Sequence, residues 1–160
     1  MILLDALAFP NQVHFPLYIN ILRTPLLNQL VLNLTTPEFQ IRLVLKHIFY
    51  RRSLVTRERV RRYAQFANLP GSHTALIRTT RQLGDKRLKA WISEQIAKID
   101  VMTQIIWGAH DSLVPPPQDS ILHHAIPSSE EPSIVDSGHV PHEELPMDTA
   151  NLITTFLNSK

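Results

Sequence analysis

The segment VMTQIIWGAHD, residues 101–111, constrains the fold of this chain more than any other. Its apolar residues are interrupted by few polar ones and end at Gly108. This pattern is typical of a strand buried on both faces of a parallel sheet. A short helix over 118–125, a second strand within PSIVDSGH and an amphipathic closing helix follow. The order strand, helix, strand, helix predicts a parallel α/β sheet.

The chain begins with a further strand candidate and continues with a long helical segment. Ile2–Asp5 is a short apolar run closed by an acid, which indicates a buried strand followed by a loop. From 13 to 98 the apolar residues recur at helical spacing, and Thr36-Pro37 has the residues of a helix start. We expect this all-helical segment to be an insertion between the first strand and the second.

Charge is distributed unevenly along the sequence. Residues 1–100 carry 15 Lys and Arg against six Asp and Glu, whereas residues 101–160 carry one against eight. A basic first part and an acidic second part suggest two functional layers. The net charge of +2 is small and implies no particular partner. The absence of cysteine excludes disulfides and thiolate sites within these residues.

Two residues in the second part have the positions that acid–base chemistry requires. Asp111 follows the strand that ends in Trp-Gly, and His139 follows the next strand. The two residues are 139 − 111 = 28 positions apart. Parallel α/β folds place their sites at the carboxyl ends of strands. A carboxylate there can bond one imidazole nitrogen, fix its tautomer and stabilise the imidazolium that forms during catalysis.

The surrounding motifs resemble the C-terminal end of an α/β-hydrolase. The stretch IIWGAHDSLVPPPQDSILHHAIPSSEEPSIVDSGHVPHEELP contains, in the family's order, a strand ending in Trp-Gly-x-x-Asp, a Val-Pro loop, a helix ending near AIP and a strand ending in Gly-His. The match covers about residues 102–157. By this resemblance, Asp111 is the triad acid and His139 the general base.

The resemblance extends to the front of the chain and implies a domain organisation. MILLDALAFPN is similar to the strand and loop that lead into the family's cap, and the helices after it are similar to the cap of lid-bearing esterases and lipases. We therefore predict a partial α/β-hydrolase fold, with a three-stranded parallel sheet remnant, flanking helices and an all-helical cap. Residues 1–12 and 99–160 would form the hydrolase core and residues 13–98 the cap.

The nucleophile of the family is missing from this sequence. Its elbow has the form Gly-x-Ser-x-Gly, with two glycines four positions apart. The chain has four glycines, at positions 71, 84, 108 and 138, so no such motif occurs. In the family, the elbow and the oxyanion loop lie upstream of the strand that begins this chain. The sequence thus resembles a hydrolase from just after the nucleophile helix onward.

These features lead to two hypotheses. The first is a serine-hydrolase-type protein for ester-like acyl substrates, inactive alone, and either truncated or half of a split enzyme. The second is a non-enzymatic binding module derived from a hydrolase. No cofactor, metal or nucleic acid is implied. Ile2–Asp5 would present an unpaired edge that favours a homodimer or a complementing polypeptide. The sequence leaves open the substrate, a serine or aspartate nucleophile, and the origin of the truncation.

Other residues have more ordinary interpretations. The arginine-rich run RRSLVTRERVRRY has an apolar stripe, so a solvated lid helix explains it better than phosphate binding. Glu143 or Glu144 is expected to support the His139 loop or the following helix start rather than to join His142 in a metal site. Asp119 and Asp136 are expected at the surface. Five aromatic residues could line an acyl pocket, although the core is favoured: Phe9, Phe15, Phe49, Tyr50 and Trp91.

The sequence shows no sign of membrane targeting. MILLDALAFP lacks a basic leader and is interrupted by Asp5, so it does not have the pattern of a signal peptide. No apolar run approaches the length of a membrane span. The expected localisation is therefore cytoplasmic.

Overall fold

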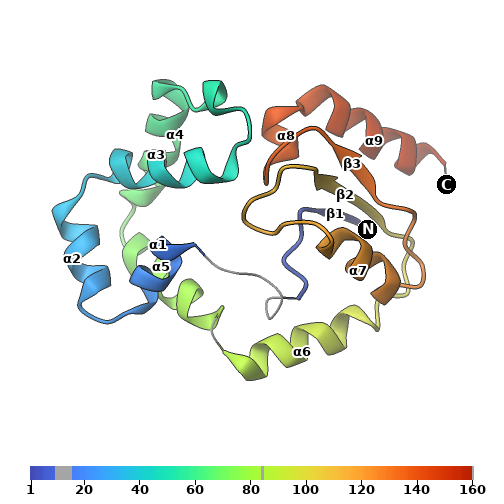
Figure 1. The fold of residues 1–160 in the computed structure, drawn as a ribbon, viewed down its shortest axis with the longest axis horizontal. Coiled ribbons are helices and arrows are strands. Elements are labelled where there is room, and N and C mark those ends of the chain that lie inside the picture. Colours follow the sequence, from blue (N-terminus) through green and yellow to red (C-terminus); the bar gives the residue numbers. More distant parts are fainter. Residues whose placement is uncertain (10–15, 84, 160) are drawn as a thin grey trace.

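The computed structural model describes residues 1–9, 16–83 and 85–159. Three strands form a parallel sheet in the order β1-β2-β3, with bounds Ile2–Leu4, Gln104–Gly108 and Ser133–Val135 (Figure 1). Leu4 of β1 pairs with Ile106 of β2. The predicted parallel sheet is therefore confirmed.

The central strand β2 is buried along its whole length. Its residues Ile105 and Trp107 pack in one core cluster with Leu122 of α7 (Gln118–Ala125). Trp107 also donates from Nε1 to the carbonyl of Val114, 3.0 Å away, which ties the following loop to the strand. Burying side chains of this size contributes roughly 1.5–3 kcal/mol each, so β2 and α7 are a major source of stability. The apolar run found in the sequence forms the centre of the sheet.

The chain between β1 and β2 is helical. The elements are α1 (Leu17–Arg23), α2 (Leu27–Leu34), α3 (Pro37–Ile48), a 3₁₀ turn (Arg52–Leu54), α4 (Arg57–Ala67), α5 (Ser72–Gln82) and α6 (Lys86–Ile96). In Figure 1, α1–α5 lie together on one side of the molecule and the sheet on the other, and α6 leads back toward the sheet. The domain limits at 98/99 and 12/13 stay predictions, and the second lies outside the described residues.

Local hydrogen bonds explain where several of these helices begin. Thr36 accepts at Oγ1 from the amide of Phe39, 3.3 Å away, and so caps α3. Thr56 caps α4 in the same way through the amide of Arg59, at 3.1 Å. Each such cap satisfies a backbone donor that the helix itself leaves unpaired, worth about 1 kcal/mol.

A second core cluster joins α3, the 3₁₀ turn and α4. Its buried members are Leu45, Phe49, Val55 and Val60. Leu54 and Tyr63 pack against it, so the apolar stripe of the arginine-rich run faces this core. Val140, next to His139, packs against the same cluster.

Ion pairs cross between the basic helical segment and the acidic C-terminal part. Arg51 lies 2.9 Å from Asp136, and both Arg59 and Arg62 lie within 3.4 Å of Glu143. Glu143 also accepts a hydrogen bond from the hydroxyl of Tyr63. The uneven charge distribution of the sequence therefore appears in the structure as ion pairs, because the basic helical segment contacts the acidic C-terminal part.

The two C-terminal helices close the structure. α8 (Pro141–Glu144) begins two residues after His139, and α9 (Pro146–Asn158) contacts β2. The surface prediction was wrong for Asp119, which is buried in the first turn of α7, and right for the exposed side chain of Asp136. Among the described residues, no helix combines the length and apolar character needed to cross a membrane.

Candidate active site

Asp111 is held rigidly in the loop that follows β2. Its Oδ1 accepts from the amides of Leu113 and Val114, at 2.8 and 2.9 Å, and the residue is only 3% exposed. Two backbone donors on one carboxylate oxygen fix the orientation of the carboxylate. The other oxygen, Oδ2, is thereby directed toward the loop after β3.

His139 meets that oxygen from the neighbouring loop. Its Nδ1 lies 2.8 Å from Asp111 Oδ2, and its backbone amide donates to the carbonyl of Ile48 at the same distance. The hydrogen bond to a carboxylate favours the tautomer with the proton on Nδ1, which leaves Nε2 to accept or return a proton. The structure thus brings together the two residues that the sequence singled out.

The electrostatic surroundings favour the charged form of His139. Burial alone lowers the pKa of His139, but the hydrogen bond and charge of Asp111, with a further contribution from Asp5, outweigh it and raise the pKa above its ordinary value of 6.5. A raised pKa makes the imidazole a stronger base, provided that the pH is high enough to leave it neutral.

Asp5 is a third polar residue at this rim that sequence reasoning did not select. It follows β1, is 3% exposed, and accepts at Oδ1 from the amide of Gly108, 2.7 Å away. Asp5, Asp111 and His139 each offer a nitrogen or oxygen that lies within 4.8 Å of the other two. The signal was present, because an acid directly after one parallel strand lies beside the residues that follow its neighbour.

Within the part of the chain that the structure describes, these three side chains form the cluster that could hold a metal ion, but several of their oxygen and nitrogen atoms already make hydrogen bonds. Asp111 binds two amides and His139, and Asp5 binds one amide. Glu143 and Glu144 are engaged elsewhere, with arginines of α4 and with backbone amides respectively. The geometry is explained most simply by acid–base chemistry.

Two glycines allow the loops of the site to approach each other. A Cβ on Gly108 would lie 2.1 Å from the carbonyl oxygen of Gly138, and one on Gly138 would lie 2.4 Å from that of Ile48. Neither position can hold a side chain without moving backbone. The glycines of the Trp-Gly and Gly-His motifs are therefore steric requirements of this rim.

Glu144 connects the His139 loop to the helical segment. Its carboxylate accepts from the amides of Gly138, Tyr50 and Arg51, at 2.7, 3.1 and 2.8 Å, and the residue is 5% exposed. The prediction that Glu143 or Glu144 supports the loop is confirmed for Glu144. Because two donors come from the segment after α3, this side chain also fixes that segment against the site.

The aromatic residues considered for an acyl pocket have different positions. Phe49 is buried in the second core cluster, and Phe9 packs against the first. Tyr50 and Trp91 are 49% and 57% exposed, so the core interpretation was wrong for these two. Phe15 lies outside the described residues.

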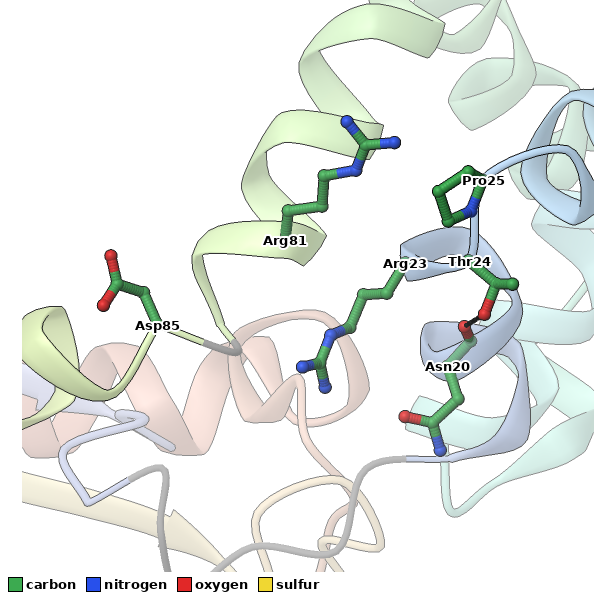
Figure 2. Close-up of a pocket in the computed structure, with 6 residues that line it drawn as sticks. All are labelled: Asn20, Arg23, Thr24, Pro25, Arg81 and Asp85. Carbon is green, nitrogen blue, oxygen red and sulfur yellow. Dashed lines mark hydrogen bonds between the residues drawn. The ribbon is translucent and has the colours of Figure 1, made fainter.

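A separate hollow opens on the helical segment. Figure 2 shows its lining: Asn20, Arg23, Thr24, Pro25, Arg81 and Asp85. Arg23 of α1 and Arg81 of α5 direct their guanidinium groups in different directions (Figure 2), so they do not converge on one ligand. None of the site residues described above belongs to this hollow.

Comparisons with known proteins agree on the fold. A meta-cleavage product hydrolase (CumD) from Pseudomonas fluorescens IP01 superposes with a TM-score of 0.72 and 23% identity, over 99% of this chain and 55% of that one. A thermophilic esterase from Thermogutta terrifontis gives a TM-score of 0.70 and 18% identity, over 99% and 55%. The chain thus spans about half the length of these solved structures.

Sequence comparison gives a shorter match. Lipase 3 of Moraxella sp. (strain TA144) is 36% identical over 61 residues, which are 38% of this chain and 19% of the lipase. No family model matches the chain. Taken with the sheet order and the structural superpositions, the chain has the fold of part of an α/β-hydrolase.

Proposed function

We propose that this chain supplies the acid and the general base of a serine-hydrolase-type catalytic triad that acts on ester-like acyl substrates. The observation that carries the proposal is the 2.8 Å contact between Asp111 Oδ2 and His139 Nδ1 at the carboxyl edge of a parallel sheet. In this role His139 takes a proton from the nucleophile and returns it to the leaving group, while Asp111 stabilises the imidazolium.

The nucleophile would come from polypeptide outside these 160 residues. The sequence contains no Gly-x-Ser-x-Gly, and the serines beside the site are engaged with backbone. Ser112 donates to the carbonyl of His47 at 2.6 Å, and the buried Ser137 donates to that of Gly138 at 3.2 Å. Neither hydroxyl is directed to His139.

The open edge of β1 is the place where such a polypeptide would dock. Within the described residues β1 pairs with β2 alone, so its other edge offers unpaired amides and carbonyls. A parallel strand added there would end at the same rim as β1, and an elbow following that strand would bring its serine near His139. A second copy of this chain would cover the edge but would supply no elbow.

The test is hydrolysis of a short p-nitrophenyl ester by the chain alone and after mixing with a polypeptide that carries the elbow strand. Any exposed imidazole hydrolyses such esters slowly, so a histidine-dependent background has to be separated from catalysis by His139. Two variants do this: His139→Ala removes the proposed base, and His142→Ala removes a nearby histidine as the matched control. We expect turnover only in the mixture, with a loss of roughly 10⁴–10⁶ in kcat for His139→Ala and little change for His142→Ala. Equal turnover by both variants would contradict the proposal, and silence of every mixture would favour the binding module.

A further inference from the structure

Two buried carboxyl groups lie side by side at the candidate site, and their hydrogen bonding is unequal. Asp111 accepts from two amides and faces His139, whereas the carboxylate of Asp5 accepts from one amide of the described residues. The second oxygen of Asp5, Oδ2, is buried and has no hydrogen-bond partner among the described residues. A buried, ionised oxygen without a donor costs several kcal/mol, which makes this arrangement unstable as a pair of anions.

Within residues 1–9, 16–83 and 85–159, only one group that can carry a positive charge acts on Asp5. The charged groups that act on Asp5 are Asp111, which repels its anion, and His139, which attracts it. One imidazole cannot neutralise two carboxylates, and like charges held this close do not both ionise readily. The less well hydrogen-bonded carboxyl, Asp5, is the one that should retain a proton.

We propose that Asp5 is a positioning residue that keeps its proton through the acidic range up to about neutral pH and donates its O–H to Asp111. The proton gives the unpartnered Oδ2 a hydrogen bond and leaves the Asp5–Asp111 pair with one negative charge. Asp5 would thereby limit the charge beside His139 without touching substrate. The φ angle of 41° at Asp5 lies in the left-handed region, which Asp and Asn tolerate better than most residues, so an Asn at this position keeps the backbone conformation.

The electrostatics of the site support the assignment. Burial raises the pKa of Asp5 from 3.8 to about 7, against the opposing hydrogen bond from the amide of Gly108. Once Asp5 loses its proton, a second negative charge acts on His139 and favours the imidazolium, because the charge of Asp5 raises the pKa of His139. The two groups should therefore titrate as a coupled system.

The inference extends the proposed function, because it gives Asp5 a role through the Asp111–His139 pair. Its test reads protonation and not turnover, so the two proposals can fail separately. Failure of the mixing assay leaves the protonation of Asp5 open to measurement, and an ionised Asp5 would leave the pair with its proposed catalytic role.

The experiment is an NMR-detected pH titration of the purified chain in the presence of a chelator. The observed signals are the carboxyl carbon of Asp5 and the ring nitrogens of His139. The variants are Asp5→Asn, which mimics the neutral acid, and the matched control Asp136→Asn, which removes an exposed acid that contacts Arg51 and His110.

We expect the Asp5 carboxyl to titrate with a midpoint near pH 7 and His139 to show an inflection at the same pH. That inflection should disappear in Asp5→Asn and persist in Asp136→Asn. A midpoint of the Asp5 carboxyl below about pH 5, or identical His139 curves in wild type and Asp5→Asn, would overturn the proposal. If Asp5→Asn does not fold, the midpoint of the Asp5 carboxyl titration in the wild-type chain is sufficient to support or overturn the proposal.

Discussion

Replacement of Glu144 by alanine should destabilise the chain severely without removing any group that does chemistry. The carboxylate accepts three backbone hydrogen bonds while 5% exposed, so its loss leaves the amides of Gly138, Tyr50 and Arg51 without their acceptor. An unsatisfied buried donor costs about 1–3 kcal/mol, and water entering the space would recover part of this. We expect a loss of about 3–5 kcal/mol in the free energy of unfolding.

This loss is a large part of the roughly 5–15 kcal/mol typical of a domain. Equilibrium urea unfolding, followed by circular dichroism, measures it as a midpoint lowered by roughly 2 M for a slope of about 2 kcal/mol/M. Glu144→Gln keeps one acceptor oxygen and should lie between wild type and Glu144→Ala.

The matched control is Glu131→Ala, because the side chain of Glu131 is 89% exposed. It should change stability by less than about 0.5 kcal/mol. A cost below about 1 kcal/mol for Glu144→Ala would refute the reasoning, since the three hydrogen bonds could not then be anchoring the His139 loop.

Three further outcomes follow from the site geometry. Asp111→Asn should lower the pKa of His139, because the hydrogen bond and charge that raise it are lost; an unchanged histidine titration by NMR would contradict this. Gly138→Ala should cost at least about 2 kcal/mol in urea unfolding because its Cβ meets the backbone at 2.4 Å, whereas Gly71→Ala, with open space but a φ of +84°, should cost about 1 kcal/mol of strain. Because the folded-state pKa of Asp5 is raised, its contribution to stability is present below pH 3.8 and is lost as the pH rises toward about 7. Between pH 3.8 and about 7, the free energy of unfolding of Asp5→Asn should therefore rise by about 2–4 kcal/mol relative to that of wild type. If the two proteins showed the same dependence of unfolding free energy on pH, a raised pKa of Asp5 would be excluded.

The strands and the acid–base pair could be predicted from the sequence because their signals are local. The apolar run through Trp107 marks a buried strand, and the positions of Asp111 and His139 after successive strands place both at one rim. Parallel pairing then brings them within hydrogen-bond distance. The positions of the two residues followed from periodicity and the geometry of parallel sheets, whereas their roles as acid and base came from the resemblance to the α/β-hydrolases.

The remaining site residues depend on contacts that local patterns do not record. Glu144 binds amides 93 and 94 positions away in the chain, so nothing in PHEELP indicates its partners. The position of Asp5 directly after β1 was a usable signal, but its contact with the amide of Gly108 depends on the register of β1 against β2. Asp119 was expected at the surface because acids usually are, but its place in the first turn of α7 faces inward.

The central claim is that Asp111 holds His139 as a base with its Nε2 available to an external nucleophile. A long-range ¹H–¹⁵N correlation spectrum of the histidines, recorded above the pKa of His139, tests it directly. We predict a neutral ring protonated at Nδ1 in the wild-type chain and a mixture of tautomers in Asp111→Asn. A ring protonated at Nε2, or the same tautomer ratio in both proteins, would contradict the claim.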